Sequence, residues 1–124
     1  PIAESYTFGR SKEEGGFYAA CEWLKANTSA NVRVMGRPAY LLSLYSDRTV
    51  TQIEPHPNPK VQEKAYLSKN KIDYLVADTW TWAKTDRYVT PYLAVYGKNW
   101  RLVWEDKRSG VKIWQRIAPY EITP

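Results

Sequence analysis

The stretch that decides the fold is IDYLVADTWTW, which runs from Ile72 to Trp82 near the middle of the chain. Its first six residues are almost all apolar, and an acid, Asp78, follows them. A near-continuous apolar run of this length predicts a strand in a parallel sheet that is covered on both faces. Two tryptophans, Trp80 and Trp82, follow the acid with a threonine before each. The stretch therefore predicts the innermost strand of a sheet, followed by a rim that contacts a ligand or a lipid.

Helical and β-type patterns alternate along the rest of the chain. Helices are expected over residues 17–26, 38–45, 60–70 and 87–96, and strands over 31–36, 49–53 and 72–77. Two further alternating runs, 100–105 and 111–116, are joined by a turn and predict a hairpin. This order predicts a three-layer α/β domain, with a mainly parallel sheet of about five strands flanked by helices and a C-terminal antiparallel hairpin.

The inner faces of the expected helices follow from the same spacing. The first helix has an apolar stripe of Phe17, Ala20, Cys21 and Leu24, and the second has one of Tyr40, Leu41, Leu44 and Tyr45. A weaker stripe in the third helix consists of Val61, Ala65 and Leu67. Pro91 is expected in the fourth helix only if it lies in the first turn, where a proline is tolerated.

Composition narrows the class of protein. With 124 residues, 44% of them hydrophobic, the chain is long enough for one domain with a packed core. The net charge of +5 comes from Lys and Arg spread along the chain, so nucleic acid is not an expected partner. A single cysteine, Cys21, and a single histidine, His56, exclude an internal disulfide and predict no metal site. The glycines form neither a dinucleotide fingerprint nor a P-loop, so no cofactor is expected in this fragment.

Five phrases stand in a consistent order over about residues 14–117. They are ACEWLKANT at 20–28, VRVMGRPAY at 32–40, YSDRTV at 45–50, IDYLVAD at 72–78, and the closing pair LVWED at 102–106 with VKIW at 111–114. In this order and spacing they resemble the C-terminal soluble domains of multi-spanning, GT-C type glycosyltransferases. The similar enzymes are of the dolichyl-phosphate-mannose protein mannosyltransferase and aminoarabinose transferase type.

This resemblance implies an accessory role. The family's catalytic acids lie in a loop between early membrane helices, and no residue here matches that motif. The implied function is that of a non-catalytic domain of a membrane glycosyltransferase that uses a polyprenyl-phosphate-linked sugar. Such a domain helps to position the acceptor or donor, or packs on the membrane part.

The resemblance also implies partners and a location. The implied location is extracytoplasmic and tethered to the membrane, and the implied partners are the membrane part of the same polypeptide, a lipid-linked sugar or acceptor, and the membrane surface. Residues 1–13 are then an irregular linker from the membrane part, 14–118 a single α/β domain and 119–124 a tail. Because the chain begins at Pro1 without a methionine, a processed product or an excised piece is expected.

Candidate ligand-binding residues follow the predicted strands. In an open α/β sheet ligands bind at the carboxyl ends of the strands, and Arg37, Glu54 and Asp78 come after three of them. With Trp80 and Trp82 they predict a polar cleft in which Arg37 holds a phosphate or carboxylate and the indoles stack on a sugar. The plainer alternative is that Arg37 and Asp78 pair or cap a helix and that the tryptophans cover the core. A tryptophan belt at a membrane surface is a third interpretation.

Two further interpretations stay open. The residues Asn27-Thr28-Ser29 form an N-x-S/T sequon, which predicts glycosylation of Asn27 in an extracytoplasmic compartment. The alternative functions are a free-standing carbohydrate- or protein-binding module and a small hydrolase that uses Asp78. Hydrolysis needs two carboxylates at a fixed separation, which no spacing in the sequence indicates, so no catalytic residue is assigned.

Overall fold

The computed structural model describes residues 11–54, 56–80 and 85–121. The strands are β1 (Arg33–Gly36), β2 (Thr49–Gln52), β3 (Tyr74–Ala77), β4 (Trp100–Asp106) and β5 (Val111–Arg116). The helices are α2 (Lys12–Asn27), α3 (Ala39–Ser46), α4 (Pro59–Val61), the π-helix η1 (Gln62–Ser68), α5 (Asp86–Tyr96) and the short 3₁₀-helix η2 (Gly97–Asn99). The predicted alternation of helices and strands, closed by a hairpin, is therefore confirmed.

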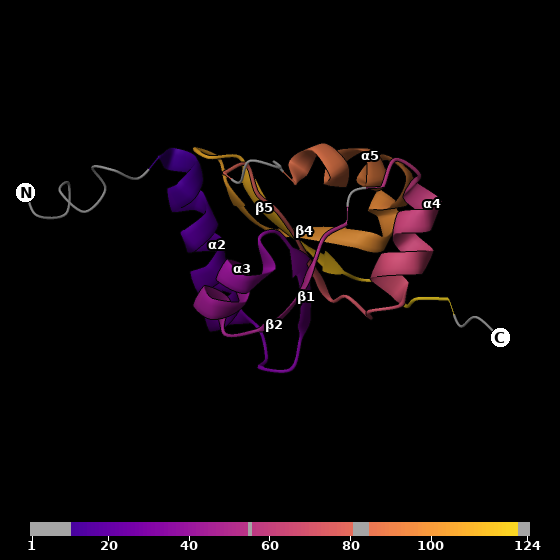
Figure 1. Cartoon of the computed structure of the whole chain (residues 1–124), viewed down its shortest axis with the longest axis horizontal. Coiled ribbons are helices and arrows are strands. Elements are labelled where there is room, and N and C mark those ends of the chain that lie inside the picture. Colours follow the sequence, from indigo (N-terminus) through magenta and orange to yellow (C-terminus); the bar gives the residue numbers. More distant parts are fainter. Residues whose placement is uncertain (1–10, 55, 81–84, 122–124) are drawn as a thin grey trace, which may run out of the picture.

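The strands form one sheet in the order β2-β1-β3-β5-β4. β1 pairs in parallel with both β2 and β3, whereas β5 runs antiparallel to β3 and to β4. Helices α2 and α3 lie on one side of the sheet, and α4, η1 and α5 lie on the other (Figure 1). The predicted α/β class, with about five strands flanked by helices, is confirmed.

Strand β3 is the middle member of the sheet, and all four of its residues are buried. Successive side chains of a strand point to opposite faces, so Val76 joins the core cluster under α2, and Leu75 joins the cluster under α5. The central apolar run of the quoted stretch is thus the innermost strand, as the sequence predicts.

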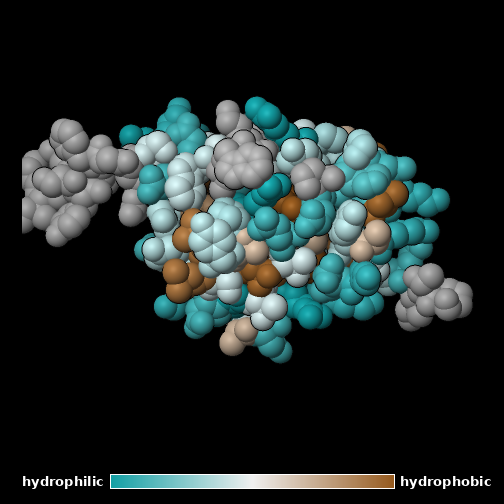
Figure 2. Space-filling model, in the orientation of Figure 1, coloured by the Kyte–Doolittle hydropathy of each residue, from teal (hydrophilic) through white to brown (hydrophobic). Residues whose placement is uncertain are grey.

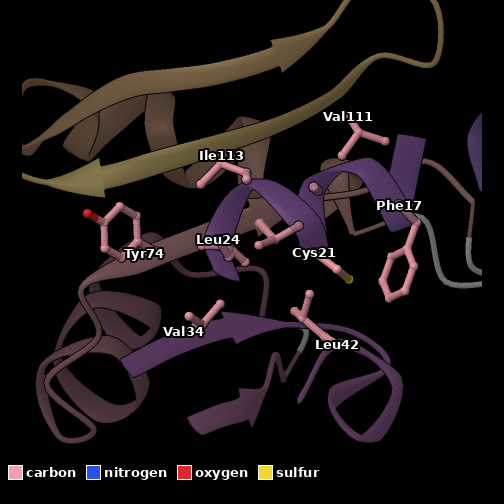
Figure 3. Close-up of a cluster of buried hydrophobic side chains, with 10 residues drawn as sticks. Phe17, Cys21, Leu24, Val34, Leu42, Tyr74, Val111 and Ile113 are labelled. Carbon is pink, nitrogen blue, oxygen red and sulfur yellow. The ribbon is translucent and has the colours of Figure 1, made fainter. Parts of the chain in front are cut away.

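Helix α2 buries the stripe that its sequence predicts. Phe17, Ala20, Cys21 and Leu24 are all fully buried. They belong to one buried cluster with Val34 of β1 and with Val111 and Ile113 of β5. Figure 3 shows side chains of this cluster between α2 and the sheet. Burial raises the pKa of the Cys21 thiol to about 12, so the thiol stays protonated near neutral pH and acts as a small core residue.

Helix α2 begins at Lys12, earlier than the predicted start at residue 17. Ser11 is its N-cap, and the Ser11 hydroxyl accepts the backbone N–H of Glu14 at 3.1 Å. Gly15 and Gly16 consequently lie inside the helix. Their surroundings differ, because a Cβ on Gly15 would meet nothing within 4 Å, whereas one on Gly16 would lie 2.0 Å from Ser109 Oγ.

We expect Gly15→Ala to raise the free energy of unfolding by about 0.5–1 kcal/mol, because alanine restricts the unfolded chain and favours the helix. Gly16→Ala should instead lower it by about 1–3 kcal/mol, because the new methyl group displaces Ser109 and the β4–β5 turn. Urea unfolding of both variants measures the difference. Equal effects of the two substitutions would contradict this packing of α2 on the hairpin.

The inner face of α3 differs from the predicted one. Tyr40, Leu44 and Tyr45 are exposed, and the buried residues of the helix are Leu42 and Ser46. Hydrophobic side chains gather over α3 in the left half of the face shown in Figure 2. Leu42 can pack on the sheet because Gly36 of β1 has no side chain. A Cβ at Gly36 would lie 2.4 Å from Leu42 Cδ2. The missing side chain leaves a space on β1 that Leu42 fills.

The third helix was expected to be a plain α-helix over 60–70, and its predicted face is only partly right. Leu67 is buried as predicted, Val61 is half-buried and Ala65 is exposed. The other buried residues are Gln62 and Glu63, the first two residues of the π-helix. Glu63 has partners inside, as described below.

Pro91 lies in the interior of α5, not in its first turn as the sequence predicts. A proline at such a position removes one helical hydrogen bond and costs about 3 kcal/mol. The bond that is lost would have been accepted by the carbonyl of Arg87, one turn earlier. The helix ends at Gly97 as predicted, where Gly97 donates its N–H to the Leu93 carbonyl.

Candidate functional site

The backbone forms the sheet edge that the sequence predicts, where the carboxyl ends of three strands meet. β1 lies between β2 and β3, and all three are parallel, so their carboxyl ends share one edge. Arg37 directly follows β1, Asp78 directly follows β3, and Glu54 follows β2. Ile53 donates its N–H to the Gly36 carbonyl at 3.0 Å, which continues the β1–β2 pairing up to this edge. The sequence thus places these three positions correctly along the fold.

Asp78 is fully buried at this edge. Its backbone N–H donates to Thr85 Oγ1 at 2.9 Å, and the Thr85 hydroxyl in turn donates to its carboxylate. These bonds join the end of β3 to the residue that precedes α5, so they fix where α5 starts. A carboxylate with 0% exposure is not open to a substrate, which counts against the small-hydrolase interpretation.

Trp80 covers the end of the core. It is half-buried and packs against the cluster under α2, with its ring 5.1 Å from that of Phe17 and 5.8 Å from that of Tyr18. This is the arrangement of the plainer sequence interpretation. Trp82 lies outside the described residues. Arg37 is half-buried and Glu54 is exposed, and ligand binding by the edge stays a prediction.

The sequon asparagine is the last residue of α2 and is exposed. Its side-chain amide donates to the Trp23 carbonyl at 3.0 Å, one helical turn earlier. Ser29, the third residue of the sequon, donates its hydroxyl to the Asn31 side chain at 2.8 Å. Asn27 is thus accessible for the predicted glycosylation, which stays a prediction.

A groove of about 350 Å³ opens between α5 and the loop that leads into α4, and we call it the proline groove. Its lining residues are His56, Pro57, Pro59, Arg87, Tyr88, Pro91 and Tyr92. The sequence predicts no site at the first three residues, and it predicts the last four only as part of a helix. No local pattern brings the two segments together, because the contact between α4 and α5 depends on the whole fold.

A buried ion pair lies behind this groove. Arg116 of β5 donates from Nη1 and Nη2 to the two carboxylate oxygens of Glu63, each at 2.9 Å, and the two side chains are 7% and 11% exposed. The Tyr92 hydroxyl also donates to Glu63, and Trp100 Nε1 donates to the Tyr92 oxygen at 2.9 Å. The guanidinium lies 3.8 Å from the ring centre of Tyr120. No sequence pattern predicts this network, because its members come from five separate segments.

The pKa values within this network reflect its burial. Burial by itself lowers the pKa of Arg116, but the hydrogen bonds to Glu63 and the nearby charge outweigh it, so the pKa is raised above its usual value. Burial also raises the pKa of Tyr92, and its hydrogen bond to Glu63 raises it further. Arg116 therefore stays charged and Tyr92 stays neutral, which is the state that holds the network together.

A second cavity of about 440 Å³ borders the same ion pair on another side and is rimmed by Lys64, Lys98 and Glu121. Within the described ranges, no three His, Cys, Asp or Glu side chains come together as a metal site would require. Nor does any helix in the described part of the chain combine the length and the apolarity needed to cross a bilayer.

Among known proteins, the informative likeness comes from solved structures. No protein-family model matches the chain, and no curated protein matches it either. Among solved structures, the chain is similar to the C-terminal globular domain of an oligosaccharyltransferase from Archaeoglobus fulgidus. The likeness has a TM-score of 0.50 at 12% sequence identity, and it covers 86% of this chain and 97% of that domain. The chain therefore shares the fold of that domain almost from end to end.

Proposed function

We propose that this chain is the extracytoplasmic domain of a membrane glycosyltransferase that uses a polyprenyl-phosphate-linked sugar. In this role it does not catalyse transfer itself but helps to position the acceptor or donor, or packs on the membrane part. The observation that carries the proposal is the fold shared with 97% of the oligosaccharyltransferase domain. The mannosyltransferase type is supported by the five ordered sequence phrases alone.

Two features of the described residues support an accessory rather than a hydrolytic role. The acid that follows the central strand, Asp78, is buried and bonded to Thr85, so it joins β3 to α5. The surface instead carries an apolar helix face on α3, with Tyr40 and Leu44 strongly exposed. Exposed apolar surface of this kind is typical of domains that contact another part of a larger protein.

Cell fractionation tests the proposal against a free-standing binding module. An antiserum raised against the 124-residue chain should detect a polypeptide much larger than this chain's 14.4 kDa in immunoblots of the source cells. That polypeptide should stay in the membrane fraction after alkaline carbonate washing. A small species released by carbonate would overturn the proposal and favour the free-standing module.

We expect Arg37→Ala in the full-length enzyme to lower transfer about tenfold through a higher KM for donor or acceptor, because one charge-assisted hydrogen bond is lost. Arg33→Ala is the matched control, since Arg33 is exposed at the amino end of the same strand. Transfer assays on membranes with equal amounts of each variant measure the effect. Unchanged kinetics in Arg37→Ala would remove Arg37 from the predicted site.

A further inference from the structure

The proline groove has walls that are rigid and apolar. Pro57 and Pro59 stand on one side, and Pro91 of α5 stands on the other. A proline ring fixes φ and carries no N–H, so these walls offer methylene groups without backbone donors. A groove built in this way changes little when a ligand enters, which favours binding because little freedom is lost.

Pro91 has no role in the core that would account for its position. It is exposed inside α5, where a proline weakens the helix, yet its ring lines the groove. A contribution to the groove wall gives this residue a function that offsets its effect on the helix. Pro91 therefore lowers the stability of α5 but shapes the wall of the groove.

The tyrosines make the floor of the groove. Tyr92 is buried, and its hydroxyl is held by Glu63 and Trp100, so its ring is fixed in orientation. Tyr88 is half-buried beside it. The volume of about 350 Å³ lies within the range of small-molecule sites.

The charge of the groove is positive. Arg87 is exposed, and within residues 11–54, 56–80 and 85–121 its guanidinium has no hydrogen-bond or ion-pair partner. His56 Nδ1 accepts the N–H of Asn58 at 3.0 Å, so in neutral imidazole the proton is on Nε2, which donates to no other group in the described part of the chain. None of the described lining residues is acidic. The groove thus combines an apolar body with a cation and a second donor.

We propose that the proline groove binds a prenyl phosphate, with the isoprenoid chain against the prolines and Tyr88 and the phosphate on Arg87 and His56. Arginine matches phosphate because its planar guanidinium donates two parallel hydrogen bonds. This inference rests on the proposed function and deepens it, since it assigns the polyprenyl-phosphate end of the donor to specific residues of this chain.

The test is a ¹H–¹⁵N NMR titration of the 124-residue chain with farnesyl phosphate below its aggregation threshold. The backbone amides of His56, Asn58, Arg87, Tyr88 and Tyr92 are expected to shift together. Farnesol and inorganic phosphate, titrated separately, should each bind at least tenfold more weakly than farnesyl phosphate. Absence of shifts, or shifts confined to residues outside the groove, would overturn the proposal.

Three variants sharpen the result. Arg87→Gln should raise the Kd for farnesyl phosphate about tenfold and leave that for farnesol unchanged, since one charged hydrogen-bonding group is removed. Lys98→Gln removes a positive charge at the cavity of about 440 Å³ instead, and it should leave the Kd values for farnesyl phosphate and for farnesol unchanged. Pro91→Ala should raise the Tm yet raise the Kd severalfold, a combination that a purely structural residue would not give. Unchanged affinity in Arg87→Gln would overturn the assignment.

The fractionation test of the proposed function and the binding test of the groove can fail independently of each other. A large, carbonate-resistant polypeptide whose domain does not bind farnesyl phosphate would overturn the groove assignment alone. Binding of farnesyl phosphate by a chain that proves to be small and carbonate-soluble would overturn the proposed function and leave the groove as a prenyl-phosphate site.

Discussion

Replacing Arg116 with methionine is expected to lower the free energy of unfolding by about 3–5 kcal/mol. The substitution keeps much of the side-chain volume but leaves the carboxylate of Glu63 buried without its cation. An unpaired buried charge is costly because neither water nor another group compensates for its lost hydration.

The surroundings of Arg116 make this effect larger than that of an ordinary salt bridge. Besides the two bonds to Glu63, its Nε donates to the Ala118 carbonyl at 2.7 Å, and its guanidinium packs on Tyr120. Tyr120 in turn donates its hydroxyl to the Ile72 carbonyl at 2.7 Å, just before β3. Loss of the guanidinium therefore loosens residues 118–120 as well as η1, because both depend on the same group.

Urea unfolding of three variants measures the effect. Arg101→Met is the surface control, because Arg101 is exposed on the neighbouring strand and, among the described residues, its side chain hydrogen-bonds to Gln115 alone. The stability of this variant should stay within about 0.5 kcal/mol of that of the unmodified chain. The double variant Glu63→Met with Arg116→Met removes both charges and should recover most of the loss. A double variant as unstable as Arg116→Met alone would show that the charge pair is not the cause.

The parts of the fold that could be predicted from the sequence are those with a local pattern. The stripe of α2 repeats at helical spacing, and the apolar run of β3 is short and near-continuous, as is typical of a buried strand, so the burial of both was predicted correctly. The strand after Asn31 and the closing hairpin follow from the same kind of pattern. Element ends were less accurate because caps such as Ser11 act through single hydrogen bonds.

The errors occur where a partner far along the chain decides which face is buried. α3 is apolar nearly all round, so its period does not select a face, and Gly36 on β1 selects Leu42 instead. In η1 the buried Glu63 looks like a surface acid, because its partner Arg116 lies 53 residues further along the chain. No pattern within a short window carries that information.

The candidate site divides in the same way. The edge positions Arg37 and Asp78 could be placed because parallel strands put their carboxyl ends together. Their side-chain roles could not, since the bond between Asp78 and Thr85 depends on how α5 returns to the sheet. The proline groove could not be foreseen either, because His56 and Arg87 come from separate segments that meet only when α4 and α5 pack together.

Leu42→Ala is expected to lower the free energy of unfolding by about 2–5 kcal/mol, whereas Leu44→Ala should change it by less than about 0.5 kcal/mol. The two leucines stand two positions apart in α3, but Leu42 is 0% exposed and Leu44 is 70% exposed. Truncating Leu42 opens a cavity above Gly36, and β1 cannot close it without leaving its pairing with β2 and β3. Truncating Leu44 removes only atoms that already contact water.

Urea midpoints of the two variants measure the difference, because helix propensity changes almost equally in both. A larger loss for Leu44→Ala would mean that α3 packs on the sheet through the face predicted from its sequence, and the apolar surface available to a membrane part would then be absent.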